Sequence, residues 1–102
     1  MDFYYTYVLY SKKDKQNYHG FTKNLKLRIE QHNKGEVEST KYRRPLDLIY
    51  FEACLDKKDA IKREKYFKTY YGRMFLKKRL SNYYQELNSY STGQVGLENN
   101  IK

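Results

Sequence analysis

Glu64 is the residue whose position most strongly suggests chemistry, because it is an acid within an apolar helix face. It lies in a predicted helix over residues 57–71, whose apolar residues are Ala60, Ile61, Phe67 and Tyr71. At ~100° per residue these side chains form one stripe, and Glu64 falls near its middle. A buried carboxylate is costly unless it is paired with a cation or binds a metal. The pattern therefore predicts an ion pair with Arg or Lys, an acid reaching out from the edge of the stripe, or a lone carboxylate for Mg²⁺.

An arginine and a histidine one helical turn apart form a second candidate pair. Arg28 and His32 belong to a predicted helix that ends at about Asn33. His32 shares a face with Leu25 and Ile29, and Arg28 lies on the edge of that face. Singly, such a histidine is most often a packing residue and such an arginine is most often solvated. Together they could clamp a phosphate and accept a proton near neutral pH.

The composition limits the class of protein. The chain has 102 residues with 21 Lys+Arg against 12 Asp+Glu, a net charge of +9, and 13 Tyr with no Trp. This indicates one small, basic, aromatic-rich domain rather than a disordered tail. The single cysteine, Cys54, excludes an internal disulfide, and no Cys or His spacing suits zinc. Neither a secretory leader nor the ~18 apolar residues of a membrane span are visible. We expect a cytoplasmic protein, no membrane, and a nucleic-acid partner.

The positive charge is concentrated in the first part of the chain. Residues 85–102 contribute only Glu86, Glu98 and Lys102, so the excess lies in residues 1–84. The stretch 91–100 is polar and lacks periodicity. We therefore expect one domain over residues 1–84, with the end of the last helix and a flexible polar tail over 85–102.

The residue patterns predict a small mixed α/β domain with the order ββαβαα. Strands are expected over residues 3–10, 16–21 and 46–52, and helices over about 24–33, 57–71 and 73–87. The first strand is aromatic and β-branched on both faces, which is typical of a central strand. Thr22 or Asn24 is expected to cap the first helix, and Gly72 to break or bend the chain between the last two. Gly20 is expected to end the second strand, where a missing Cβ permits a bend or a close ligand.

A series of short motifs resembles the GIY-YIG nuclease superfamily. The tripeptides at 6–8 and 18–20 are similar to the two motifs that name it, with Thr6, Val8 and His19 replacing the family's Gly, Ile and Ile. The matching segments that follow in the same order are 20–25, Arg28, 32–35, 40–41, 43–45, Ala60, 63–65, Lys68, 72–73 and 75–77. The likeness covers about Tyr4 to Tyr84. It is nearest to the small stand-alone bacterial members, which resemble the nuclease domain of the excision-repair subunit.

This resemblance implies an α/β fold with a three-stranded antiparallel sheet flanked by helices, and phosphodiester hydrolysis with one divalent ion, Mg²⁺ or Mn²⁺. Carried over by residue, Glu64 is the metal ligand, Tyr18 helps to activate the attacking water, and Tyr7 orients or relays a proton. Arg28 would hold the scissile phosphate and offset charge in the transition state. His32 would accept or relay a proton.

Further basic residues are expected to contact phosphates without reading sequence. The nucleic-acid-binding candidates are Gly20, Lys41, Arg43, Arg44, Lys65, Lys68 and Arg73. The sequence therefore predicts a divalent-metal-dependent DNA endonuclease, selective for branched or damaged DNA, of the repair or recombination type. Two alternatives remain open: a non-catalytic nucleic-acid-binding module that keeps the fold, and an adaptor that docks on a larger repair or ribosomal assembly.

Overall fold

The computed structural model describes residues 2–91, with the side chains of 89–91 excepted. The elements in chain order are β1 (Tyr4–Ser11), β2 (Asn17–Thr22), α1 (Leu25–Asn33), β3 (Leu46–Cys54), α2 (Lys57–Phe67), α3 (Tyr70–Arg79) and α4 (Ser81–Ser91). They fall into two units that divide between Lys68 and Thr69, and each is described by itself. Most of the predicted polar tail, residues 92–102, lies outside the described residues. No helix in the described part is long and apolar enough to cross a membrane.

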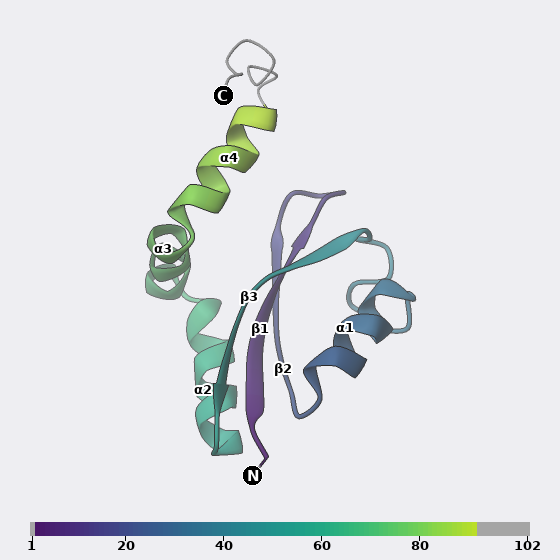
Figure 1. The fold of residues 1–102 in the computed structure, drawn as a ribbon, viewed down its shortest axis with the longest axis vertical. Coiled ribbons are helices and arrows are strands. Elements are labelled where there is room, and N and C mark those ends of the chain that lie inside the picture. Colours follow the sequence, from purple (N-terminus) through teal and green to yellow (C-terminus); the bar gives the residue numbers. More distant parts are fainter. Residues whose placement is uncertain (1, 92–102) are drawn as a thin grey trace. The chain divides into compact units, whose positions relative to one another are not determined.

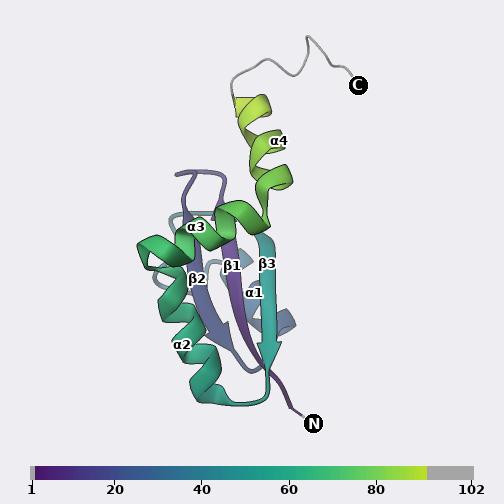
Figure 2. The ribbon, with the colours of Figure 1, turned by 90° about the vertical axis from the view of Figure 1, so that its left-hand side faces the viewer.

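The first unit is built on an antiparallel sheet with the strand order β2-β1-β3. The prediction of a central, two-sided first strand is confirmed, because residues 6–11 of β1 are all buried. Figures 1 and 2 show α1 and α2 on opposite faces of this sheet. The two faces of β1 therefore have different neighbours, and the alternation of side chains assigns Tyr7 to the face of α1 and Thr6 to that of α2.

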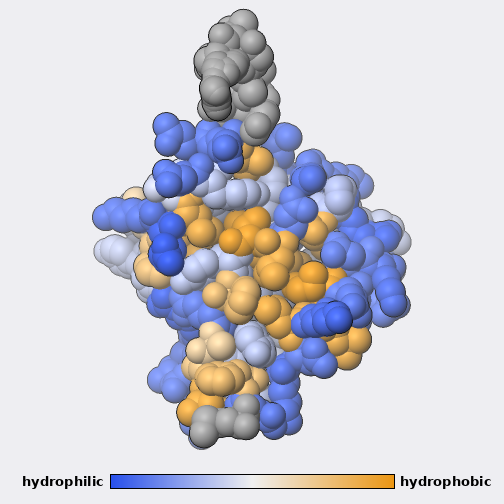
Figure 3. Space-filling model, in the orientation of Figure 1, coloured by the Kyte–Doolittle hydropathy of each residue, from blue (hydrophilic) through white to orange (hydrophobic). Residues whose placement is uncertain are grey.

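The α1 face holds the core cluster. Tyr7, Leu9 and Leu46 are buried together, and the partly buried side chains packed against them are Tyr18, Leu25 and Ile29. Asn24, one of the two predicted caps, begins α1 by accepting a hydrogen bond from the Leu27 N–H at 3.1 Å. Next to this core, hydrophobic residues gather over β3 and α1 in Figure 3, along an open groove whose lining includes Tyr5, Leu48 and Phe51.

A hydrogen bond and an aromatic cluster join α2 to its face of the sheet. The Thr6 hydroxyl donates to the Ala60 carbonyl at 2.8 Å. About two turns further on, the Phe67 ring is fully buried, and its centroid lies 6.0 Å from that of the His19 ring and 6.2 Å from that of the Tyr50 ring. Ala60 and Phe67 thus form the apolar stripe that the sequence predicted for this helix.

The predicted end of α2 is wrong. The helix stops at Phe67 rather than Tyr71, because Thr69 has extended backbone (ψ 166°) and its hydroxyl accepts a hydrogen bond from Gly72 N–H at 3.1 Å. A threonine that caps the next helix competes with continuation of the previous one. The interruption therefore lies at Thr69, Gly72 is in the first turn of α3, and Tyr71 is 74% exposed rather than part of the α2 stripe.

The predicted helix over residues 73–87 is two helices. Leu80 leaves the helical conformation with φ −114° and ψ 32°, and it separates α3 from α4. The apolar spacing of Leu76, Leu80 and Tyr84 continues across the break, so periodicity alone predicted a single helix. The observed order is ββαβααα.

Gly20 does not end the second strand. β2 continues to Thr22, and Gly20 is paired with Tyr7 in the register of the sheet. A Cβ at Gly20 would lie 2.5 Å from the Tyr7 hydroxyl oxygen and 2.6 Å from Cζ of its ring. The close approach predicted at this glycine is therefore made by the Tyr7 side chain. A contact of Gly20 with nucleic acid stays a prediction.

Candidate active site

The centre of the candidate site is a buried chain of three polar side chains from three segments. Tyr7 comes from β1, His32 from the end of α1 and Thr40 from the loop before β3. The Tyr7 hydroxyl is hydrogen-bonded to His32 Nε2 at 2.8 Å, and the Thr40 hydroxyl to His32 Nδ1 at 2.7 Å. Tyr7 is 1% exposed, and His32 and Thr40 are both 0% exposed. Both ring nitrogens of the histidine are therefore satisfied without solvent.

Tyr18 packs against this chain from β2. Its ring centroid lies 5.2 Å from that of His32, edge on, and 6.5 Å from that of Tyr7. Its hydroxyl accepts a hydrogen bond from the Ser39 hydroxyl at 3.3 Å. The two tyrosines predicted to take part in chemistry are thus brought into contact with each other and with the predicted histidine.

Arg28 lies half-buried on α1, one turn before His32. Its guanidinium donates to Gln31 Oε1 at 3.2 Å. It also faces the Tyr7 hydroxyl, where its positive charge lowers the pKa of that group. The predicted grouping of Arg28 with Tyr7 and His32 is therefore observed.

Burial decides the protonation of the two central groups. Loss of solvation raises the pKa of Tyr7 above its ordinary value of 10.0, and the charge of Arg28 only partly opposes this shift. Burial, together with the positive charge of Arg28, lowers the pKa of His32 from 6.5 to about 4. At neutral pH the pair is therefore a neutral phenol hydrogen-bonded to a neutral imidazole.

Glu64 is partly buried, at a position that the helical stripe had predicted to face the core. Its side chain is 13% exposed, and Oε2 lies 2.5 Å from Nζ of Lys68, four residues later on the chain. This ion pair is one of the three arrangements that the sequence left open for Glu64. Its negative charge also contributes to raising the pKa of Tyr7, so the carboxylate lies within electrostatic reach of the tyrosine on the other face of β1.

The donor set around Glu64 restricts the kind of ion that could bind. Residues 2–91 contain no group of three or more His, Cys, Asp or Glu side chains that could hold a metal. A zinc site with three or four protein ligands does not fit this arrangement. A single, mostly shielded carboxylate fits Mg²⁺ or Mn²⁺, which take one or two protein carboxylates and complete their shell with water and phosphate oxygens.

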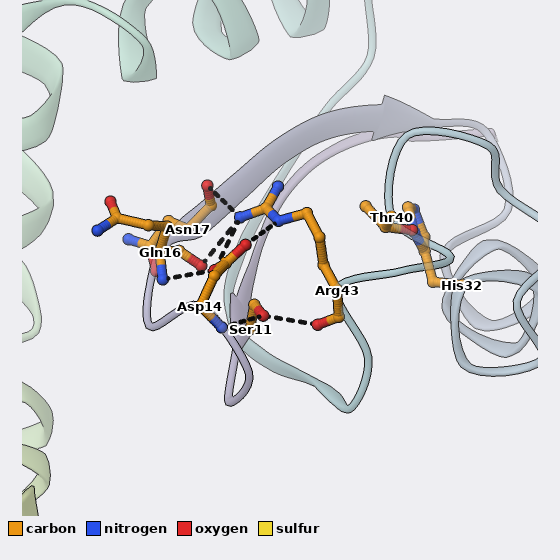
Figure 4. Close-up of polar contacts among 7 residues, drawn as sticks. All are labelled: Ser11, Asp14, Gln16, Asn17, His32, Thr40 and Arg43. Carbon is orange, nitrogen blue, oxygen red and sulfur yellow. Dashed lines mark hydrogen bonds and ion pairs between the residues drawn. The ribbon is translucent and has the colours of Figure 1, made fainter.

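Arg43, predicted to contact nucleic acid, has an internal partner. Its Nε lies 2.5 Å from Asp14 Oδ2, and Nη2 donates to the Gln16 carbonyl at 3.3 Å. Its own carbonyl accepts a hydrogen bond from the Ser11 hydroxyl at 2.6 Å. Figure 4 shows these contacts joining the loop of Arg43 to the hairpin turn between β1 and β2, with Thr40 beside His32 elsewhere on the loop. Arg43 therefore anchors the loop that carries Thr40.

Its neighbours in the loop are more open. Arg44 is exposed, donates from Nε to the Lys41 carbonyl at 3.0 Å, and lies over Gly35, where a Cβ would meet its guanidinium carbon at 2.7 Å. Lys41 pairs with Glu38 at 3.2 Å and lies over the ring of Tyr42, which is 74% exposed. The remaining predicted contacts, Lys65, Lys68 and Arg73, are exposed, and Arg73 belongs to the second unit.

Thr40 and Ser39 were missed by the sequence analysis as site residues. Thr40 belonged to a motif of the resemblance, but no role attached to it, because a threonine in a basic loop has no pattern that marks it as buried. The sequence feature that could have indicated it is His32, because a histidine on an apolar helix face needs a hydrogen-bond partner for each of its two ring nitrogens.

Comparison with known proteins indicates the family of this chain. Residues 3–78 match the family described as the GIY-YIG catalytic domain. A UPF0213 protein of Staphylococcus aureus strain Mu3 is 39% identical over 71 residues, covering 69% of this chain and 85% of that protein, and the UPF0213 protein of strain Mu50 gives the same values. The solution structure of a UPF0213 protein from Bacillus halodurans is 28% identical, covers 72% of this chain and 81% of its own, and has a TM-score of 0.46. The chain belongs to the GIY-YIG catalytic domain family, and it is similar to the UPF0213 proteins within it.

Proposed function

We propose that this chain is a divalent-metal-dependent endonuclease that hydrolyses DNA phosphodiester bonds and selects its substrate by structure or damage. The observation that carries the proposal is the buried hydrogen bond between Tyr7 and neutral His32 beside the Arg28 guanidinium. A phenol, a proton acceptor and a phosphate-binding cation are the groups that such hydrolysis needs. Membership of a nuclease family supports the same reaction class.

Arg28 is the residue that would hold the scissile phosphate. Its guanidinium is half-buried on α1 and faces the Tyr7 hydroxyl. A planar guanidinium can bind two phosphate oxygens at once, and partial burial strengthens that interaction. Negative charge that develops on the phosphate in the transition state would therefore be stabilised next to the tyrosine pair.

His32 and the two tyrosines would handle the proton. Because its pKa is lowered to about 4, His32 is unprotonated at neutral pH and can accept a proton from the Tyr7 hydroxyl at Nε2. Tyr18, in ring contact with both, would orient the attacking water. The Ser39 hydroxyl, which donates to that of Tyr18, would leave the Tyr18 hydrogen available for this water.

Glu64 is the residue that would hold the divalent ion. When bound there, the ion would polarise the phosphoryl oxygen and stabilise the leaving 3′ oxygen. The Lys68 ammonium, now 2.5 Å from the carboxylate, would have to give up part of this contact and could then approach a phosphate.

Selection by DNA shape follows from the kind of surface that surrounds the site. The cations there suit phosphate contacts, which position a protein without reading bases. They are the exposed Arg44 and the partly exposed Lys41 in the loop, the exposed Lys65 on α2, and the exposed Lys68 directly after α2. A domain of this size offers little area for base readout. Branched, flapped or damaged duplexes of the kind met in DNA repair or recombination are therefore the substrates we expect.

The test uses a panel of labelled DNAs: duplex, single strand, 5′ and 3′ flaps, a four-way junction and an abasic duplex, each with Mg²⁺, Mn²⁺ or EDTA. Glu64→Gln is the test variant, and Glu36→Gln, an exposed acid outside the site, is its matched control. We expect cleavage of branched or damaged DNA by the wild type and by Glu36→Gln, and none by Glu64→Gln, which should still bind DNA.

Equal cleavage by the wild type and Glu64→Gln, or cleavage that persists in EDTA, would contradict the proposal. Tight binding without cleavage of any DNA in the panel would support the non-catalytic module instead.

A further inference from the structure

Thr40 occupies a position in the buried chain that none of the roles above explains. Its hydroxyl lies 2.7 Å from Nδ1 of His32. Tyr7 is hydrogen-bonded to the other ring nitrogen, Nε2, so Thr40 and Tyr7 lie on opposite sides of the histidine ring. A threonine could be placed there simply to fill space, but burying its hydroxyl without use would cost free energy. The short contact to a ring nitrogen gives the hydroxyl a specific partner.

The hydrogens of this chain can be assigned by counting donors and acceptors. A neutral imidazole carries one N–H and has one nitrogen with a lone pair. Arg28, which can only donate, faces the Tyr7 oxygen. A Tyr7 hydroxyl that accepts from Arg28 keeps its own hydrogen to donate to its other neighbour, His32 Nε2. In that arrangement Nε2 is the acceptor, and the N–H is on Nδ1, where it donates to the Thr40 hydroxyl.

We propose that Thr40 is a positioning residue that holds His32 in the tautomer with the hydrogen on Nδ1, so that the Nε2 lone pair faces the Tyr7 hydroxyl. In the other tautomer an N–H would point at Tyr7, and His32 could not accept its proton. The use of this arrangement in catalysis rests on the proposed nuclease function, whereas the tautomer itself does not.

The proton step is balanced within the pair. The O–H bond of Tyr7 breaks, its electron pair stays on the phenolate oxygen, and the proton forms an N–H bond at His32 Nε2. The resulting imidazolium keeps its Nδ1–H, which still donates to Thr40. The threonine oxygen thus accepts the same hydrogen bond before and after the transfer, and it need not move during the step.

The loop is built to hold Thr40 at this place. The Thr40 N–H donates to the Val37 carbonyl at 3.1 Å, the Arg43 N–H donates to the Thr40 carbonyl at 2.8 Å, and the Val37 side chain is buried. The ion pair of Arg43 with Asp14 fastens the far end of the same turn (Figure 4). The backbone of Thr40 is therefore restrained on both sides of its hydroxyl.

The first readout is nuclear magnetic resonance of the ¹⁵N-labelled His32 ring, whose two nitrogens distinguish the tautomers without any DNA or metal. The variants are Thr40→Val, which keeps the shape and removes the hydroxyl, and Thr40→Ser, which restores it; His19→Gln identifies the signals of the other histidine. We expect the Nδ1–H tautomer in the wild type and Thr40→Ser, and a shift of population to Nε2–H in Thr40→Val.

The second readout is cleavage of the best DNA in the panel. Positioned proton transfer contributes ~10²–10⁴-fold to rate, so Thr40→Val should lower kcat by ~10–100-fold with KM changed less than ~3-fold, and Thr40→Ser should restore most of it. The backbone spectrum of each variant checks its fold. If Thr40→Val does not fold, the tautomer measured in the wild type and in Thr40→Ser still tests the inference.

An Nε2–H tautomer in the wild type, or an unchanged tautomer in folded Thr40→Val, would overturn the inference whatever the activity. The predicted tautomers in a protein that cleaves no DNA would instead leave the role of Thr40 in place and reject the proposed function. The two failures are therefore distinguishable.

Discussion

The Tyr7 hydroxyl and His32 Nε2 lie 2.8 Å apart in a part of the domain that solvent does not reach. Burial moves the two pKa values in opposite directions, upward for the phenol and downward for the imidazole, because in each case it disfavours the charged form. The hydrogen bond therefore joins two neutral groups whose proton transfer needs help from the charges around them. The positive charge of Arg28 acts on both groups.

We expect His32 to titrate at about 4 in the folded protein, against 6.5 for an ordinary histidine. The unfolded chain then binds a proton at a higher pH than the folded one, so this group stabilises the fold fully above pH ~6.5, and the contribution is lost as pH falls toward 4. The groups that face the ring and act on it are Tyr7, Tyr18, Thr40 and Arg28. A pH titration of the His32 ring signals, with Tm measured at pH 5 and 7, checks this.

An ordinary midpoint near 6.5 for His32 would contradict the buried, neutral state. The variant Arg28→Gln provides the control for the second cause: removing the positive charge should raise the midpoint while leaving it below 6.5.

Gly20→Ala should force the Tyr7 ring out of its place. The new Cβ would lie 2.5 Å from the Tyr7 oxygen, far inside van der Waals contact. Overpacking of this kind costs ~1–3 kcal/mol, so the midpoint of urea unfolding should fall accordingly. Displacing Tyr7 should also break its bond to His32, so the His32 midpoint should rise toward 6.5. A variant with wild-type stability and an unchanged His32 titration would show that Tyr7 does not lie over Gly20.

The adjacent arginines of the loop should respond differently to removal. Arg43→Ala loses the pair with Asp14 and the bonds to backbone carbonyls, so Tm should fall while DNA affinity per folded molecule changes little. Arg44→Ala should leave Tm nearly unchanged but weaken DNA binding, with the slope of log Kd against log salt reduced by ~1 if one phosphate contact is lost. Fluorescence anisotropy over a salt series, beside thermal unfolding, separates the two. The reverse pattern would mean that Arg43 is the phosphate contact.

The Arg43 pair has its own pH signature. The Arg43 guanidinium beside Asp14 holds the pKa of that carboxyl below its ordinary value of 3.8. A carboxyl whose pKa is lowered in the folded protein stabilises the fold at pH values above its ordinary pKa. This contribution is lost as the pH falls through the lowered pKa of the folded state. In Arg43→Ala, a pH titration of the Asp14 carboxyl signal should give a pKa that has returned toward 3.8.

Metal binding can be measured apart from cleavage. Mn²⁺ is paramagnetic, so titration into the ¹⁵N-labelled protein should broaden the amide signals around Glu64 and Lys68 first. Glu64→Gln should abolish this local broadening, and Glu36→Gln, the exposed control, should not. Broadening that is equal in both variants would place the ion elsewhere. Removal of the ion with EDTA should restore the spectrum, because residues 2–91 contain no group of three or more metal-ligating side chains that an ion would have to hold together.

The sequence by itself determined the elements whose signals are local. Alternation and turn residues placed β1, β2, α1 and β3 to within about two residues, because each buries side chains at a period that its own segment displays. The same periodicity identified Glu64 as an acid on the apolar face of its helix, since the face of a helix is set by residues three and four apart. The resemblance of the motifs identified Tyr7, Tyr18, Arg28 and His32, and the structure brings these four together.

Only the tertiary structure decided the rest, because those features depend on partners far apart in the chain. Whether a helix continues past Phe67 depended on a competition between its backbone bonds and the Thr69 hydroxyl, which periodicity does not register. The role of Arg43 as a loop anchor depended on the hairpin turn, which brought Asp14 to it from 29 residues away. Thr40 had no signal of its own, and it became part of the site because folding placed its hydroxyl on a histidine nitrogen where no water could serve instead.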